Sequence, residues 1–227
     1  DNQRPLAISG GRMTALMPAG ARQTRTDDPC LDPAAPRVFR YVVAYDYGTA
    51  PRPYDGVCTL AICKPKIRAT ARPGDWIIGF RSRQPGEVIY AMEVGEILGF
   101  AEYWAAPRFA SHRPGATSKP DNIYRPGPNG FEQVPNDIHS PADARRDLNG
   151  QKVLVSHRFW YFGRNSVPIP NSLVHLVHAT QGHAVYKNRK SGDVRALSEW
   201  LAAWPPGKHG APVGANDGAE THESEVL

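Results

Sequence analysis

A short, basic segment of the chain contains two of its three cysteines, Cys58 and Cys63. Four cations follow the second cysteine at short spacing: Lys64, Lys66, Arg68 and Arg72. If the segment is extended, the first three cations project from one face, because side chains alternate along a strand. Such a row would bind a phosphate backbone and release its counterions. It would equally serve as the charged, solvated edge with which natural sheets avoid aggregation.

Cys63 is a candidate catalytic residue of this segment. It lies five positions after Cys58, so the two thiols face opposite sides of a straight strand, which argues against a local disulfide or metal pair. A Cys63 thiolate would be a nucleophile if Lys64 or Arg68 lay beside it, since nearby cations lower the pKa of a thiol. The alternative is that Cys63 is a small, buried hydrophobic residue.

A long polar stretch, residues 107–150, contains a second set of candidates. A loop of this length inside a compact domain is usually functional or disordered. The stretch carries Asp121, Asn122 and His139. A carboxylate, an amide and an imidazole brought together would serve acid–base chemistry or read the edge of a base. Asp and Asn are also ordinary turn residues, so loop architecture explains the first two equally well.

Aromatic side chains are the candidates for holding a base. Most aromatic residues pack in cores, but one or two at the mouth of a sheet would stack on an unpaired base, which contributes about 1–3 kcal/mol per base. We select Tyr47, Tyr124 and Phe162 for this role. Asp46, next to Tyr47, is a candidate for polar recognition or proton transfer.

Three histidines near the end of the chain suggest a metal site at first sight. His175 and His178 would share a helix face and could ligate one ion. However, no carboxylate lies among them and Gly182 interrupts the pattern before His183, so we favour partly exposed histidines of a polar face. The sequence also lacks a Walker loop, a dinucleotide fingerprint and a Gly-x-Ser-x-Gly elbow. We therefore expect no metal site, and the sequence indicates no particular cofactor.

The elements that must position these residues are mainly strands. Alternating apolar residues over 39–47 predict one strand, and three more are expected over 75–81, 88–94 and 153–162, the last of them central. Helices are expected over 100–106, over 171–179 with Asn171 as N-cap, and after a cap at Asp193. The sequence predicts an α+β fold: a strongly bent, mostly antiparallel sheet or small barrel, a few short helices and an amphipathic C-terminal helix.

Composition restricts the class of protein. The 227 residues, 41% of them hydrophobic and 22% charged, suffice for one domain with a core. The 21 glycines and 22 prolines favour a loop-rich fold. An odd, low count of three cysteines favours a reducing compartment. No apolar run approaches the roughly 20 residues that span a bilayer, and no secretion signal is recognisable. We expect a cytoplasmic protein without a membrane partner.

Charge and composition also divide the chain. We expect a poorly ordered arm over residues 1–36, one globular domain over 37–204 and a disordered acidic tail over 205–227. The net charge is +5, but the central part holds 22 basic and 14 acidic side chains, an excess of eight. A basic body with an acidic tail suits a polyanionic partner, although many proteins without such a partner share this pattern.

Several motifs in one order resemble the second type of nucleotide-modification-associated domain. They are Tyr45-Asp46-Tyr47-Gly48, Cys58-Thr59-Leu60-Ala61, Cys63-Lys64-Pro65, Gly74-Asp75-Trp76-Ile77, Glu102-Tyr103-Trp104, Asp121-Asn122-Ile123-Tyr124 and Gly182-His183. The resemblance spans roughly residues 38–204. It implies an association with bacterial and phage systems that alter DNA bases. A weaker architectural similarity to PUA-like modified-base readers rests on the turn at Gly74-Asp75 and implies a pocket for one flipped nucleotide.

The leading hypothesis is a protein that recognises or processes a modified nucleotide, with DNA or a nucleotide as partner and enzymes of a base-modification system as further partners. The candidate catalytic residues are Asp46, Cys63, Asp121 and His139. The candidate nucleic-acid-binding residues are Lys64, Lys66, Arg68, Arg72, Tyr47, Asn122, Tyr124 and Phe162. The alternatives are an enzyme that acts on a free nucleotide or metabolite through Cys63 or a His/Asp group, and a non-catalytic partner of a modification operon.

Overall fold

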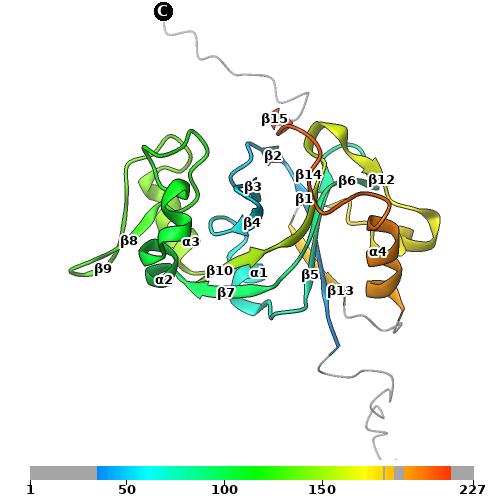
Figure 1. Ribbon diagram of the computed structural model, residues 1–227, viewed down its shortest axis with the longest axis horizontal. Coiled ribbons are helices and arrows are strands. Elements are labelled where there is room, and N and C mark those ends of the chain that lie inside the picture. Colours follow the sequence, from blue (N-terminus) through cyan, green and yellow to red (C-terminus); the bar gives the residue numbers. More distant parts are fainter. Residues whose placement is uncertain (1–34, 181, 187–191, 216–227) are drawn as a thin grey trace, which may run out of the picture.

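The computed structural model describes residues 35–180, 182–186 and 192–215. Nearly all of the predicted N-terminal arm, and the predicted tail from residue 216 onward, lie outside these residues. The described part is dominated by two sheets, with short helices around them (Figure 1). No helix in this part is long and apolar enough to cross a membrane.

The large sheet is mixed. Its order is β13-β1-β5-β6-β11-β14, and β12 pairs with β6 beside this path. β1 and β5 are parallel neighbours, and β5 and β6, at the centre of this order, form the expected antiparallel pair. The bounds are β1 (Val38–Val43), β5 (Trp76–Arg81), β6 (Glu87–Glu93), β11 (Arg158–Tyr161), β12 (Val167–Pro168), β13 (His183–Tyr186) and β14 (Gly207–Lys208).

The smaller sheet is antiparallel and positions the candidate site. Its order is β3-β4-β10-β7, with β3 (Arg52–Tyr54), β4 (Val57–Leu60), β7 (Glu96–Gly99) and β10 (Lys152–Ser156). Two further ribbons pair β2 (Tyr45–Asp46) with β15 (Gly214–Ala215) and β8 (Tyr124–Gly127) with β9 (Gly130–Gln133). The described strands form open sheets and no closed barrel. The α+β fold is therefore observed in the form of a sheet and not of a small barrel.

The helices are short. The α-helices are α1 (Pro65–Thr70), α2 (Phe100–Ala105), α3 (Ala144–Leu148) and α4 (Asp193–Leu201). The 3₁₀ turns are η1 (Pro107–His112), η2 (Pro141–Asp143), η3 (Gly163–Asn165) and η4 (Asn171–Leu176). In Figure 1, α2, α3 and the β8–β9 hairpin lie at the left of the molecule, and α4 lies beside the large sheet at the right.

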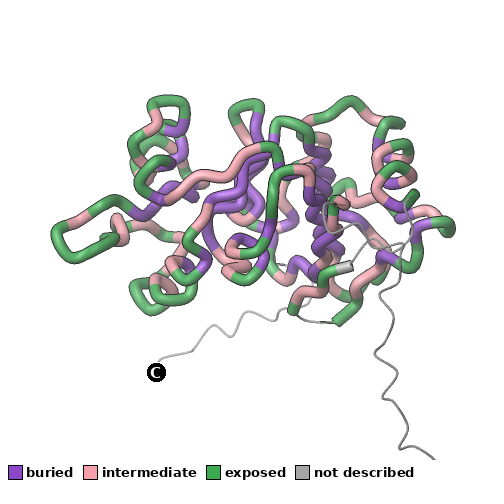
Figure 2. The backbone as a smooth tube through the Cα atoms, turned by 90° about the horizontal axis from the view of Figure 1, so that it is seen from below, coloured by how far each residue is buried: buried purple, intermediate pink, exposed green. Residues whose placement is uncertain are grey.

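Three clusters of buried side chains hold these layers together. The first contains Phe39 and Tyr41 of β1 together with Leu60 and Leu154 of the small sheet. The second lies on the other face of the large sheet, under α4 and η4. The third packs α2 and the 107–150 stretch on the small sheet. Figure 2 shows the buried residues concentrated in the strands and the exposed ones in the loops and the projecting hairpin.

Four local expectations need correction. The strand expected over 153–162 is interrupted at His157, and its halves, β10 and β11, belong to different sheets. The helix expected over 171–179 is a 3₁₀ turn without a side-chain cap from Asn171. Asp193 is the first residue of α4 and not its cap. Ordered structure also continues past residue 204, because β14 and β15 are strands and Val213 is buried.

The most consequential correction concerns the segment with the four cations after Cys63. Residues 65–70 form helix α1 and not the extended row of cations. Pro65 occupies its first turn, where proline is favourable because its fixed φ suits a helix and its missing N–H would have no partner there. Lys64, Lys66 and Arg68 therefore do not share one strand face, and Arg68 is fully buried.

Candidate active site

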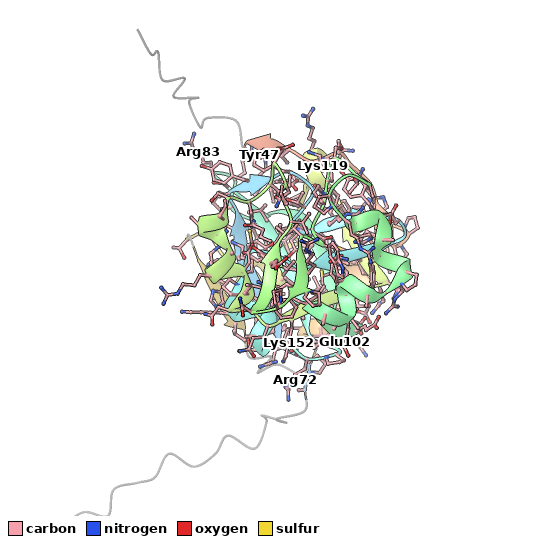
Figure 3. The ribbon with its side chains drawn as sticks, turned by 90° about the vertical axis from the view of Figure 1, so that its left-hand side faces the viewer. Tyr47, Arg72, Arg83, Glu102, Lys119 and Lys152 are labelled. Carbon is pink, nitrogen blue, oxygen red and sulfur yellow. The ribbon has the colours of Figure 1, made fainter. Side chains whose placement is uncertain are left out.

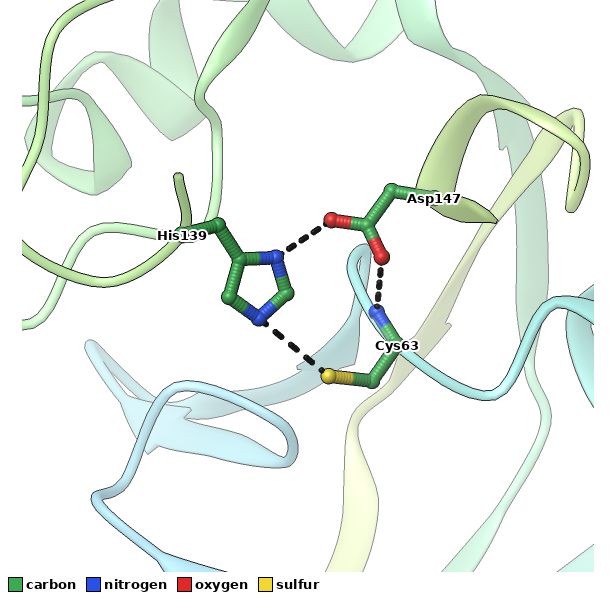
Figure 4. Close-up of side chains that lie close together, drawn as sticks. All are labelled: Cys63, His139 and Asp147. Carbon is green, nitrogen blue, oxygen red and sulfur yellow. Dashed lines mark hydrogen bonds and ion pairs between the residues drawn. The ribbon is translucent and has the colours of Figure 1, made fainter. Parts of the chain in front are cut away.

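Cys63, His139 and Asp147 form a hydrogen-bonded triad (Figure 4). The Sγ atom of Cys63 lies 3.3 Å from Nε2 of His139. The other ring nitrogen of His139, Nδ1, lies 2.5 Å from Oδ2 of Asp147. A nucleophile, a base within hydrogen-bonding reach and a third group that orients the base are the constellation of nucleophilic catalysis. The two predicted residues, Cys63 and His139, are thus brought together across 76 positions of the chain.

The backbone presents Cys63 at a sharp turn between β4 and α1. Cys63 has φ of 56° and Lys64 has φ of 40°, so two consecutive non-glycine residues adopt the left-handed conformation. Such a conformation costs free energy and is typically retained at functional sites. The surrounding structure fixes it, because the amide nitrogen of Cys63 donates a 2.9 Å hydrogen bond to Oδ1 of Asp147.

The other two members of the triad come from the 107–150 stretch. His139 follows β9, and its amide nitrogen donates to Oδ1 of Asn136 at 2.9 Å. Asp147 is buried on α3. Tyr124 of β8 donates its hydroxyl proton to Oδ2 of Asp147 at 2.9 Å. The stretch is therefore structured, and Tyr124, predicted to stack on a base, is buried against the carboxylate of Asp147.

Hydrogen bonds set the charge of the triad. Burial by itself lowers the pKa of His139, but the hydrogen bonds with Asp147 and Cys63 outweigh burial and raise this pKa to about 10. Burial raises the pKa of Asp147, yet the hydrogen bond from His139 and those from Cys63 and Tyr124 bring it below its ordinary value. At neutral pH the pair is an imidazolium beside a carboxylate. An imidazolium next to sulfur is the arrangement in which cysteine enzymes hold a reactive thiolate.

Arg68 connects the turn that carries Cys63 with the segment that carries Asp147. Its guanidinium donates to three carbonyl oxygens, those of Cys63 (2.7 Å), Lys152 (2.8 Å) and Asp147. Burial lowers the pKa of Arg68 to about 10. Gly150 lies against this guanidinium, and a Cβ at that position would stand 2.4 Å from Cζ of Arg68. Arg68, predicted to bind phosphate, instead ties the turn at Cys63 to the segment that carries Asp147.

A pocket of about 390 Å³ opens at the triad. Cys63 and His139 line it together with Lys64, and a wall of three tyrosines is formed by Tyr41, Tyr45 and Tyr47. The rings of Tyr45 and Tyr47 stack with centres 6.2 Å apart and planes 8° apart, and both side chains are largely exposed. The volume falls within the range of small-molecule sites. The pocket thus combines a nucleophile with an aromatic wall.

Asp46, another predicted catalytic residue, lies outside the triad. Its carboxylate is buried and accepts hydrogen bonds from the hydroxyl of Tyr161 at 2.7 Å and from the amide of Val213 at 3.1 Å. Burial raises the pKa of Asp46. It therefore fixes the C-terminal strand β15 to β2, directly beside the tyrosine wall. Its predicted role in proton transfer stays a prediction.

Asp121 belongs to a different buried network. Its carboxylate accepts from Thr59 and, at 2.8 Å, from Tyr103, and it lies 3.3 Å from Nδ1 of His112. Arg52 donates to the other nitrogen of that histidine, Nε2, at 2.8 Å. The network joins β3 and β4 to α2 and η1 and includes no member of the triad.

The remaining predicted binding residues are scattered. Asn122 is buried and donates to the carbonyl of Tyr103 at 3.0 Å. Phe162 is buried against Trp204. Lys66 and Arg72 are exposed. Figure 3 shows Tyr47 and Arg72 at opposite ends of the molecule, so these two do not serve one small ligand together. Their role in nucleic-acid binding stays a prediction.

The same three triad residues could also hold a metal ion, since one ligand atom from each lies within 4.8 Å of the others. The hydrogen-bond geometry favours a triad. Cys63 and Asp147 contact different nitrogens of His139, whereas an imidazole ligates an ion through one nitrogen. In addition, Nε of Arg146 stands 3.6 Å from Oδ1 of Asp147 and adds positive charge there.

Sequence reasoning missed Asp147. The only sequence pattern that points to it is the pair of apolar residues Ala144 and Leu148, which lie four positions apart and indicate a short helix. Such a helix would bury the side chain next to Leu148, which is Asp147. No spacing rule connects that helix to Cys63, because the contact depends on the pairing of β4 with β10.

Comparison with known proteins supports the resemblance inferred from the motifs. The family model described as nucleotide modification associated domain 2 matches residues 35–219. No match was found among curated proteins or among solved structures. The match covers all described elements, including the triad and the tyrosine wall. The chain therefore belongs to the nucleotide modification associated domain 2 family.

Proposed function

We propose that this protein is a cysteine-dependent enzyme that acts on a nucleotide bound in the pocket at Cys63. The observation that carries the proposal is the Cys63–His139–Asp147 triad at a pocket large enough for a small molecule. Membership of a nucleotide-modification family supports the substrate class. Of the earlier hypotheses, an enzyme that uses Cys63 with a histidine fits this geometry best.

The triad supports substitution at a trigonal carbon that carries a leaving group. The Cys63 thiolate attacks the carbon, and His139 gives its Nε2 proton to the departing group, which leaves a covalent bond between sulfur and carbon. Water then attacks the same carbon, the neutral imidazole takes its proton, and the thiolate is released. Asp147 holds the ring and stabilises the imidazolium through Nδ1.

The tyrosine wall suits the base of the substrate. Tyr45 and Tyr47 offer stacked, exposed rings at the pocket, and stacking on an aromatic ring contributes about 1–3 kcal/mol per base. Because the pocket accepts one small ligand, the substrate is a free nucleotide or a nucleotide turned out of a strand. Enzymes that add or use the modified base are the partners that the family association implies.

The test is protection of Cys63 from alkylation, followed by mass spectrometry of its peptide. We expect nucleosides or nucleotides to slow labelling of Cys63 by iodoacetamide, and the double variant Tyr45→Ala/Tyr47→Ala to lose this protection. Cys58 is buried and provides an internal control that stays unlabelled. Equal labelling of Cys63 with and without millimolar nucleosides and nucleotides would contradict the proposed substrate class.

A further inference from the structure

Lys64 is a cation in the pocket without a carboxylate partner among the described residues. Its ammonium lies 4.2 Å from the centre of the Tyr41 ring, a cation–π contact. Burial lowers the pKa of Lys64, the charge of the neighbouring Cys63 sulfur works against this shift, and the nearby charge of Arg146 adds to it. A partly buried ammonium is costly unless a counter-charge offsets the loss of water. The left-handed backbone of Lys64 nevertheless keeps it next to Cys63.

Among the described residues that line this pocket, one carboxylate is present, that of Asp143, and it is engaged by other groups. Asp143 forms an ion pair with Arg146 at 3.0 Å and accepts hydrogen bonds from the amide and hydroxyl of Ser140 at 2.9 and 3.0 Å. Arg146 lines the pocket as well, with its side chain half exposed. Besides the imidazolium of His139, the described residues that line the pocket include two cations, Lys64 and Arg146, and Asp143 neutralises the second of these.

We propose that Lys64, assisted by Arg146, forms an anion subsite beside the thiol of Cys63, which takes a phosphoryl or carboxylate group of the substrate. The inference rests on the proposed function, because the subsite and the nucleophile share one pocket. No carboxylate of the described residues pairs with Lys64, and a bound oxyanion would give its ammonium an anionic partner besides the Cys63 sulfur. The subsite makes the enzyme selective for substrates that carry a negative group close to the carbon that Cys63 attacks.

The experiment compares two alkylating reagents that differ in charge, iodoacetate and iodoacetamide. Their rate constants with Cys63 are measured at the same pH, and thiolate content cancels in the ratio because both reagents react with the same thiolate. We expect Lys64→Met to lower the iodoacetate-to-iodoacetamide ratio by roughly five- to tenfold at low salt, since one charge is removed within a few ångströms. The effect should shrink at 1 M salt.

Two variants separate this effect from general loss of charge or structure. Lys66→Met removes the same charge two positions away, on an exposed side chain, and should leave the ratio within about twofold of wild type. Lys64→Arg keeps the charge and should restore most of the ratio. A ratio that is unchanged in Lys64→Met, or lowered equally in Lys66→Met, would overturn the subsite.

Protection of Cys63 by different compounds identifies the anionic group that the subsite binds. If the group is a phosphoryl, 5′-nucleoside monophosphates and inorganic phosphate protect Cys63 better than the nucleosides and acetate. If it is a carboxylate, acetate protects better than phosphate. Equal protection by nucleosides and by their monophosphates, with no effect of either small anion, would overturn the subsite and leave the proposed function intact. Loss of protection by every one of these compounds would count against both.

Discussion

The amide nitrogen of Cys63 donates a 2.9 Å hydrogen bond to Asp147, the acid that also accepts from His139. One carboxylate thus fixes the backbone of Cys63 through Oδ1 and the ring of His139 through Oδ2. This arrangement explains how two consecutive residues, Cys63 and Lys64, are held in the left-handed conformation without glycine. Asp147 therefore determines both the position and the protonation of the site.

Replacing Asp147 by Asn should weaken its hold on the backbone of Cys63 and its effect on the protonation of His139. The amide no longer stabilises an imidazolium, so the pKa of His139 falls and the sulfur of Cys63 loses its cationic neighbour at neutral pH. We expect the alkylation rate of Cys63 at pH 7 to fall by about tenfold or more. Glu132→Gln, an exposed substitution on the β8–β9 hairpin, is the matched control and should react as wild type. An unaltered rate in Asp147→Asn would show that the carboxylate does not tune the site.

The stability of the protein should depend on the protonation of His139. The folded pKa, about 10, lies above the ordinary value of 6.5. The stabilising contribution is therefore complete below about pH 6.5 and is lost as the pH rises toward 10. Urea unfolding at pH 6 and pH 10 should show a larger difference between wild type and His139→Gln at pH 6. A difference that stays constant, or grows with pH, contradicts the assigned ion pair.

Arg68 should be a positioning residue whose loss costs stability and reactivity together. Arg68→Met leaves three buried carbonyl groups without their donor, which costs about 3 kcal/mol or more. Gly150→Ala should have a similar effect, because its Cβ would clash with the guanidinium. The exposed control Arg72→Met should change the free energy of unfolding by less than about 0.5 kcal/mol.

A second readout separates positioning from stability alone. Arg68 holds the carbonyl of Cys63, so the rate of Cys63 alkylation at pH 7 should fall in folded Arg68→Lys. If this variant is destabilised but keeps the wild-type rate, Arg68 acts on the fold and not on the site.

The C-terminal strand should support the tyrosine wall. β15 pairs with Tyr45 and Asp46, and Val213 donates to the Asp46 carboxylate. Truncation after residue 209 removes these contacts, while truncation after residue 215 keeps them. The first truncation should reduce protection of Cys63 by nucleotides several-fold, and its iodoacetamide rate without nucleotide should stay near wild type. Equal protection in the two truncated proteins would refute this role of β15.

Sequence patterns predicted part of the fold. The α+β class, the antiparallel pair β5–β6 and helix α2 follow from local periodicity and are observed. The interruption at His157 was hidden because both halves of that segment are apolar. Charged residues at every second position from Lys64 onward fit a strand, yet Lys64 and Arg68 also stand one helical turn apart, and Pro65 favoured the helix.

The candidate site was predicted only in part for a related reason. Cys63 and His139 could be selected by their chemistry, but their contact depends on how the 107–150 stretch folds back onto β4 and β10. Residue type alone did not separate them from Asp46 and Asp121, whose carboxylates serve buried structural networks. Asp147 was missed because its role is set by the tertiary structure and not by spacing.

The most direct test is the rate constant for alkylation of Cys63 by iodoacetamide at pH 7, in wild type and in His139→Gln. Because an imidazolium beside sulfur favours the reactive thiolate, we predict that Cys63 reacts about tenfold or more faster in wild type than in His139→Gln. Equal rate constants for the two proteins would contradict the claim that Cys63 and His139 form a catalytic pair.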